Sequence, residues 1–181
     1  MRVLGVDPGS HATGFGVVER IGGVLHHRQH GVIRPARGRP LPERLARLQQ
    51  ELDRVIAEAA PDVAVVERVF LAANPRSALV LGQARGVILS SLGRAGVQVA
   101  EVAARQAKQA ITGSGAADKD QVQRMVARLL ALDAPPPTDA ADALALALTQ
   151  AHAGVLTELP TRSRGRGHRQ AFTRALSERT R

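Results

Sequence analysis

Short apolar segments bounded by turn residues predict three strands at the start of the chain. The segments cover residues 2–7, 12–19 and 24–33, and their turns contain Pro8-Gly9 and Gly22-Gly23. Apolar runs of this length, closed by glycine or proline, are typical of strands rather than helices. Because the connections are short, we expect the three strands to form an antiparallel meander.

The hydrophobic period then changes from strand-like to helical. Apolar residues recur on one face from Leu41 to Ala60, and Pro61 ends that helix before a second buried strand at 63–67. A strand reached through a crossover helix is expected to lie parallel to its neighbour. The ends of the strands at 2–7 and 63–67 should therefore meet at one edge of the sheet. The later pattern predicts one more strand and four helices, at 97–102 and at 74–93, 105–112, 118–132 and 138–153.

Length and composition restrict the class of protein. The 181 residues suffice for one well-buried domain, and the absence of cysteine excludes disulfides, thiolate nucleophiles and Cys-type zinc sites. No apolar run has the length of a membrane span, and the amino terminus lacks the pattern of a signal peptide, so we expect a cytoplasmic protein with no membrane partner. Apolar residues become rare near the end of the sequence. The expected organisation is a folded domain at 1–156 and a basic, disordered tail at 157–181.

The formal net charge of +9 indicates a polyanionic partner, and we favour a nucleic acid. Part of this charge lies in the arginine-rich tail. A solvated tail that only keeps the protein soluble would also have this composition, so the charge does not decide the function by itself.

Four acidic residues stand at the ends of buried elements. Asp7 and Glu67 end two apolar strands, and Asp139 and Asp142 begin an apolar helix, one turn apart on the same face. Each residue has an ordinary alternative role, as a turn cap, a surface charge or a helix-dipole charge. Together the four positions are harder to explain in that way, because an unpaired buried carboxylate is costly.

Converging carboxylates are the ligands that Mg²⁺ requires, and two such ions can hydrolyse a phosphodiester. One ion activates the attacking water, and the other stabilises the departing oxygen. We therefore interpret the four acids as a site for two divalent cations.

Five sequence blocks closely resemble the RuvC family of Holliday junction resolvases, in the same order and at similar intervals, between about Arg2 and Ala153. The blocks are Gly5-Val-Asp7-Pro-Gly-Ser10, Val66-Glu67-Arg-Val-Phe70, Leu81-Gly-Gln-Ala-Arg-Gly86, Ala104-Arg-Gln-Ala-Lys108-Gln and Asp139-Ala-Ala-Asp142-Ala-Leu144. The resemblance implies an α/β RNase H-like fold with a mixed five-stranded sheet. It also implies a homodimer that makes paired, Mg²⁺- or Mn²⁺-dependent nicks across a four-way DNA junction and cooperates with a branch-migration motor. Carried over by motif, the catalytic acids and metal ligands are Asp7, Glu67, Asp139 and Asp142.

Further residues are candidates for DNA contact. The resemblance supports Phe70, which follows the strand at 63–67, and Lys108 and Lys119, the two lysines of the chain. Core packing is the usual role of a phenylalanine, and solvated surface charge is the usual role of a lysine. Lys119 lies in the first turn of its helix, where a cation opposes the helix dipole, and that mismatch favours a functional role. Arg76 and Arg85 are weaker candidates for contact with phosphate.

Two other features have less specific interpretations. The helix at 74–93 is apolar around much of its circumference, which is typical of a core helix or of one shared between subunits. Gly82 and Gly86 lie one turn apart on it, so it is our candidate dimer interface. His26, His27 and His30 are close in sequence, but they have no acidic residue close by in sequence and are not expected to bind metal.

Two alternatives to the resolvase function remain open at this point. One is another RNase H-like nuclease, similar to YqgF, that acts on RNA. The other is a nucleic-acid-binding protein without catalytic activity, in which the acids are structural.

Overall fold

A mixed five-stranded sheet forms the centre of the fold in the computed structural model, which describes residues 1–9, 11–68 and 75–153. The strands are β1 (Arg2–Asp7), β2 (Thr13–Ile21), β3 (Val24–Ile33), β4 (Val63–Glu67) and β5 (Gln98–Val102). The helices are α1 (Leu41–Ala59), α2 (Pro75–Arg94), α3 (Ala104–Thr112), α4 (Lys119–Leu129) and α5 (Thr138–Ala153).

The strand order is β3-β2-β1-β4-β5, which combines the predicted meander with the predicted parallel pair. Strands β1, β2 and β3 pair antiparallel, whereas β4 pairs parallel with both β1 and β5. In the β1–β4 register Val6 lies opposite Val66, so Asp7 and Glu67 end their strands side by side. The prediction that these two strand ends share one sheet edge is confirmed.

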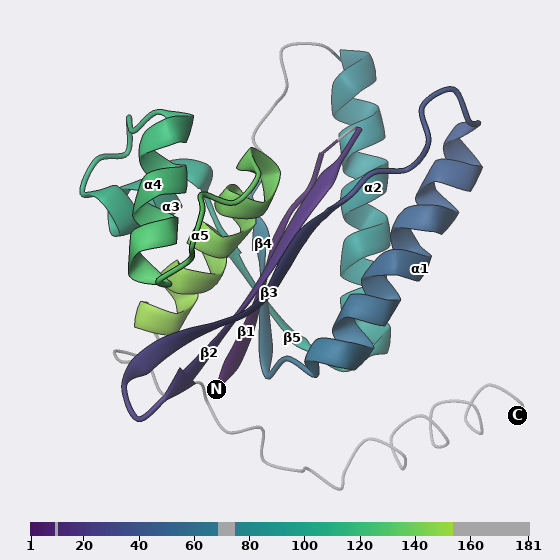
Figure 1. Ribbon diagram of the computed structural model, residues 1–181. Helices are drawn as coiled ribbons and strands as arrows, with labels where there is room; N and C mark the ends of the chain where they lie inside the picture. The colour runs from purple at the N-terminus through teal and green to yellow at the C-terminus, as the bar shows by residue number, and fades with distance from the viewer. Residues whose placement is uncertain (10, 69–74, 154–181) are drawn as a thin grey trace, which may run out of the picture.

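Helices cover both faces of the sheet, with α1 and α2 on one side and α3, α4 and α5 on the other (Figure 1). Two separate hydrophobic cores result. Alternating side chains of one strand serve different cores, because successive side chains point to opposite faces. In β1, Leu4 and Val6 pack with α1 and α2, whereas Val3 packs with the three helices of the other layer.

Helix α1 shows how local sequence sets the ends of an element. It begins after Pro40, and it ends at Ala60, which has a left-handed conformation (φ 44°) just before Pro61. Its buried residues, Leu48, Leu52, Val55, Ile56 and Ala59, recur at helical spacing. Helix α4 begins with a capping box, in which the Asp118 carboxylate accepts from the Gln121 backbone N–H at 2.7 Å and the Gln121 side-chain oxygen accepts from the Asp118 backbone N–H at 3.0 Å.

Helix α5 lies directly on the backbone of the sheet. A Cβ atom added to Gly14 would lie 1.8 Å from the carbonyl oxygen of Asp139, and one added to Gly5 would lie 1.9 Å from that of Ala143. The helix itself contributes mainly alanine and leucine, and most of its side chains are buried. Glycine on the strands and alanine on the helix therefore set the depth at which Asp139 and Asp142 lie.

Within the described part of the chain, no helix combines the length and the hydrophobicity needed to cross a membrane.

We predict that Gly14→Ala displaces the first turn of α5 and destabilises the protein by about 3 kcal/mol, because the added methyl group meets backbone atoms that cannot rotate away. Chemical denaturation measures this loss. The control is Gly93→Ala, at an open helical position, where alanine should be neutral or stabilising by up to about 1 kcal/mol. Equal stabilities for the two variants would contradict the close packing of α5 on the sheet.

Candidate active site

Three secondary-structure elements bring the four predicted acids to one edge of the sheet. Asp7 is the last residue of β1, Glu67 is the last residue of β4, and Asp139 and Asp142 lie in the first two turns of α5. Asp7 pairs with Gly14 across β1 and β2, and α5 rests on Gly14 through the carbonyl of Asp139. The same close contact thus brings the α5 acids towards the strand acids.

Asp7, Glu67 and Asp142 line a single cavity of about 160 Å³. Lys108 of α3 lines the same cavity, and its Nζ donates a hydrogen bond of 3.0 Å to the carbonyl of Ala117. The remaining walls are apolar and include Leu146 and Ala107. Carboxylates gathered in a small, largely apolar space interact strongly, because little water separates them.

Burial and the neighbouring acids raise the pKa of Asp7 to about 9. Burial is the largest cause, followed by a hydrogen bond with Glu67 and then by the negative charges of Glu67, Asp142 and Asp139. Burial and nearby like charges both favour the protonated form of a carboxyl group. In the metal-free protein, Asp7 therefore keeps its proton at neutral pH.

Asp142 also has a raised pKa, because burial disfavours its charged form. The charges of Lys108 and Lys119 oppose this shift, whereas Glu67 and Asp139 add to it. The two lysines are thus close enough to Asp142 to affect its titration. The structure gathers both of them at the acidic cluster, although one comes from α3 and the other from α4.

Asp139 stands at the rim of the cluster, where it pairs with a residue that the sequence did not reveal. The guanidinium of Arg34 lies 3.4 Å from the Asp139 carboxylate, and the Arg34 side chain is exposed whereas that of Asp139 is partly buried. Arg34 directly follows β3, the third strand of the meander. Because β3 ends opposite the start of β2, the meander offered a signal that Arg34 would lie near Gly14 and α5.

The donor set suits a hard divalent cation, since it consists of carboxylate oxygens with no sulfur ligand. Among the described residues, no three acidic or histidine side chains already form a complete metal-binding arrangement. A bound cation would neutralise the neighbouring negative charges that, together with burial, raise the pKa of Asp7. The residues present therefore fit a metal that binds with displacement of the Asp7 proton.

The other predicted contact residues have different surroundings. Phe70 lies outside the described residues. Arg76 is an exposed residue in the first turn of α2. Arg85 is engaged in a short ion pair with Glu101, which Arg68 approaches at 3.8 Å. To contact DNA, the Arg85 guanidinium would have to break its ion pair with Glu101. The role of Arg85 as a DNA contact therefore stays a prediction.

His27 and His30 face each other on β3, with Nε2 and Nδ1 2.8 Å apart. Partial burial lowers the pKa of both rings. A hydrogen bond between two neutral imidazoles accounts for the pair.

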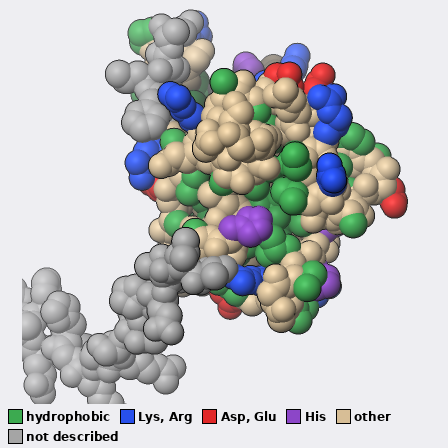
Figure 2. All heavy atoms as spheres, turned by 90° about the vertical axis from the view of Figure 1, so that its left-hand side faces the viewer, with side chains coloured by type: hydrophobic (Ala, Val, Ile, Leu, Met, Phe, Trp, Pro, Cys, Tyr) green, Lys and Arg blue, Asp and Glu red, His purple; other side chains and the backbone are tan. Residues whose placement is uncertain are grey.

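Basic side chains are spread around the face formed by α3, α4 and α5. Figure 2 shows Lys and Arg near the rim of this face, interspersed with Asp and Glu, and hydrophobic side chains towards its middle. A distributed charge of this kind suits a large polyanion that contacts several elements at once.

Comparison with known proteins gives consistent matches over most of the chain. The family model described as crossover junction endodeoxyribonuclease RuvC matches residues 3–150. A protein of the same description from Acinetobacter baumannii (strain ATCC 17978) is 47% identical over 171 residues, covering 91% of this chain and 94% of the relative. The structure of Thermus thermophilus RuvC in complex with a Holliday junction substrate superposes with a TM-score of 0.77 at 36% identity, over 83% of this chain and 93% of that one.

A more distant structure supports the fold alone. The yeast mitochondrial Holliday junction resolvase Ydc2 is 15% identical, with a TM-score of 0.61 over 82% of this chain and 77% of its own. The expected RNase H-like architecture is confirmed by these matches and by the observed strand order.

We predict that the metal-free protein loses stability as the pH rises between about 4 and 9. In that interval the folded Asp7 carboxyl holds a proton that the unfolded chain releases, so unfolding becomes more favourable by up to about 1.4 kcal/mol per pH unit. Urea unfolding in the presence of a chelator measures this slope. Asp7→Asn should flatten it and stabilise the protein at pH 8 by on the order of 2 kcal/mol.

The same variant should lose the stabilisation that Mn²⁺ gives the wild type. An unchanged pH slope in Asp7→Asn would mean that the Asp7 carboxyl is not the buried, protonated group described here.

Proposed function

The chain belongs to the RuvC family of crossover junction endodeoxyribonucleases, and on that premise we propose how its own residues cut a four-way junction. It is an endonuclease that resolves Holliday junctions in DNA recombination and repair. The observation that carries the assignment of the active site is the cavity shared by Asp7, Glu67 and Asp142, with Asp139 at its rim.

Asp7, Glu67, Asp139 and Asp142 are proposed to hold two divalent cations, Mg²⁺ or Mn²⁺. Such ions supply a nucleophilic hydroxide and stabilise the charge on the departing oxygen. Asp7 gives up its proton when the site is loaded, which makes it an anionic ligand. Asp139 leaves its ion pair with Arg34 for the same purpose, and that pair costs little to break because it is exposed.

Lys108 and Lys119 are proposed to position the phosphodiester. Both act electrostatically on Asp142, so a phosphate near the acids would also lie near two ammonium groups. Lys108 is anchored by its hydrogen bond to Ala117, which limits the entropy lost when it binds an oxygen. Phe70 remains a proposed DNA contact on the strength of the family motif, and Arg76 and Arg85 remain weaker candidates for contact with phosphate.

The active molecule is proposed to be a homodimer, because a four-way junction has approximate two-fold symmetry and two related cuts need two related sites. Helix α2 supplies the candidate interface. Leu79 is 66% exposed, and a Cβ added to Gly82 or Gly86 would meet nothing within 4 Å, so this face is open to a second chain.

Family membership extends the proposal to cooperation with a branch-migration motor and to a cytoplasmic location. From the composition of the chain we also propose a nuclease domain at residues 1–156 and a separate basic tail at 157–181.

We predict that Asp7→Asn keeps junction binding but slows cleavage at least about 100-fold, because the ligand charge is lost while the DNA-binding surface stays intact. Gel-shift and cleavage assays on a mobile synthetic junction with Mg²⁺ and with Mn²⁺ measure both quantities. Mapping the two nicks tests whether they are symmetric. Unchanged cleavage would reject the assignment of Asp7, and preferential cleavage of structured RNA would favour the YqgF-like alternative.

We predict that Leu79→Glu weakens the dimer roughly 100-fold, since the dimer would bury an unpaired carboxylate there. Analytical ultracentrifugation measures the association. On a cruciform plasmid, this variant should give mainly nicked circles where the wild type gives linear product. Leu129→Glu, at an exposed leucine of α4, is the control and should leave the association unchanged. Equal dimerisation of the two variants would place the interface elsewhere.

A further inference from the structure

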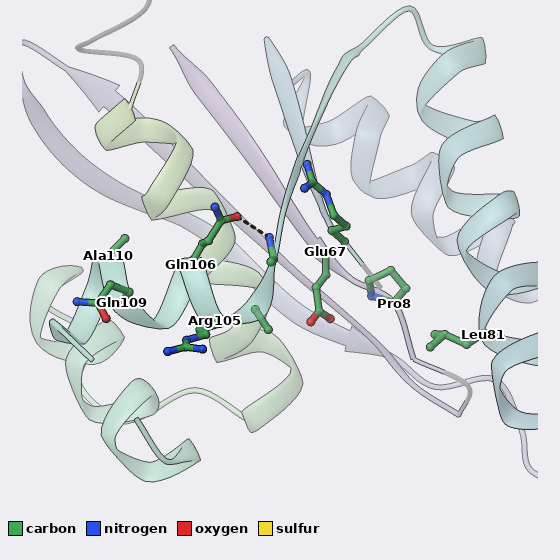
Figure 3. A pocket seen from close by; sticks show the side chains of 10 residues that line it. Pro8, Glu67, Leu81, Arg105, Gln106, Gln109 and Ala110 are labelled. Atoms are coloured by element: carbon green, nitrogen blue, oxygen red, sulfur yellow. Dashed lines mark hydrogen bonds between the residues drawn. The ribbon is translucent and has the colours of Figure 1, made fainter. Parts of the chain in front are cut away.

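A cavity of about 910 Å³ lies between β3, which is an edge strand of the sheet, and the connection from α4 to α5. None of the four acids lines it. It differs in this from the groove of about 880 Å³ that Figure 3 shows between Leu81 of α2 and Arg105 of α3, with Glu67 between them. That groove shares Glu67 with the acidic cavity and is part of the active site. The cavity at β3 is a separate place in the fold.

Two histidines of β3, His27 and His30, line this cavity together. Residues three apart on a regular strand point to opposite faces of a sheet. Here the register between β2 and β3 shifts between Val17 and Val18, and Arg28 is left without a partner on β2. An extra residue of this kind is a β-bulge, which changes the alternation of side chains along its strand.

The partners of the two histidines on β2 show that both rings lie on the same face of the sheet. Gly16 lies opposite His30, and Val18 lies opposite His27. A Cβ added to Gly16 would meet Leu144 of α5, and the buried Val18 packs in the same core as Leu144. Both histidines therefore lie on the face that α5 covers, although their spacing in the sequence predicts opposite faces.

The contact between the two rings has the spacing of two ligands on one metal ion. His27 Nε2 and His30 Nδ1 are 2.8 Å apart, and the ring planes are inclined by 55°. Two nitrogens bound at about 2.0 Å and at right angles to each other lie about 2.8 Å apart, whereas a tetrahedral pair would lie about 3.3 Å apart. The observed spacing therefore matches square-planar coordination, which Cu²⁺ and Ni²⁺ favour.

The hydrogen bond between the rings holds these nitrogens together while no metal is bound. When an ion binds, the proton between them moves to the outer nitrogen of its own ring, so both rings stay neutral. Each ring then turns its inner lone pair towards the ion. The cavity in front of the rings has room for this rotation and for water molecules that complete the coordination.

The surroundings favour a cation. The sequence has no acidic residue close to these histidines, but the fold brings Asp133 of the α4–α5 connection to the same cavity. Among the described residues, the Asp133 side chain has no hydrogen bond and no ion pair. Arg28 also lines the cavity, and its charge is balanced by Glu19 at 2.6 Å.

We propose that His27 and His30 chelate one Cu²⁺ or Ni²⁺ ion, with water as the remaining ligands and Asp133 as a nearby negative charge. This site goes beyond the proposed function, because it uses imidazole nitrogens and none of the four acids. Mg²⁺ is not expected there, since it binds through oxygen ligands. The chain can therefore bind two classes of metal at two places.

The first test is a calorimetric titration of the full-length protein with Ni²⁺ after treatment with a chelator and addition of excess Mg²⁺. The wild type should bind one equivalent tightly. His27→Ala and His30→Ala should each weaken this binding roughly 100-fold, because two ligands on one scaffold act as a chelate. His11→Ala, at an exposed histidine between β1 and β2, is the matched control and should bind as the wild type does. Urea unfolding without Ni²⁺ establishes that each variant is folded.

The second test counts the ligands directly in the unmodified protein. Pulsed electron paramagnetic resonance of bound Cu²⁺ detects each coordinated imidazole, and the absence of cysteine excludes competing thiolates. We expect two imidazoles in the wild type and one in His30→Ala. The wild-type result does not depend on the folding of any variant.

The proposal is wrong if Ni²⁺ affinity survives both histidine substitutions, because the ion would then lie elsewhere on the chain. Fewer than two imidazoles on Cu²⁺ in the wild type would also overturn it. Neither result concerns the resolvase function, which is measured by Mg²⁺-dependent cleavage of a junction. Loss of cleavage in a protein that binds Ni²⁺ as described would in turn leave the histidine site intact.

Discussion

The direct contact between helix α5 and the backbone of β1 and β2 is the constraint on which the active site depends. No side chain separates the two elements at Gly5 and Gly14, so the first turn of the helix lies as close to the sheet as atoms allow. This contact brings Asp142 to the cavity that Asp7 and Glu67 also line, and the parallel pairing of β1 and β4 places those two acids side by side. Because glycine and alanine allow this close packing, acidic side chains from separate elements gather in one small space.

That concentration is costly for the folded protein until a cation arrives. Burial and like charges hold a proton on Asp7, and Arg34 partly neutralises Asp139 at the rim. In the absence of metal, a proton therefore neutralises Asp7 and the Arg34 guanidinium pairs with Asp139. Both are exchangeable, which suits a cluster that we propose binds divalent ions beside a phosphodiester.

The positive groups form a second layer around these acids. Lys108 and Lys119 come from consecutive helices and converge near Asp142, whereas Arg105 is among the residues that line the neighbouring groove. An acidic centre surrounded by cations lets a polyanion approach a site that would otherwise repel it. In our proposal, charges of opposite sign have separate tasks, with carboxylates for metal and cations for phosphate.

Local pattern in the sequence determined the elements, the meander, the parallel pair and the positions of the four acids. It did so because alternation, helical period and turn residues act over a few residues, and because a strand–helix–strand connection has few solutions. It did not reveal Arg34, the engagement of Arg85 by Glu101, or the groove beside Glu67. Each of these depends on how deeply a helix packs and on which partner a flexible side chain finds across more than ten residues of chain. Only the tertiary structure decides such contacts, since their energies are small and many alternative pairings fit the same sequence.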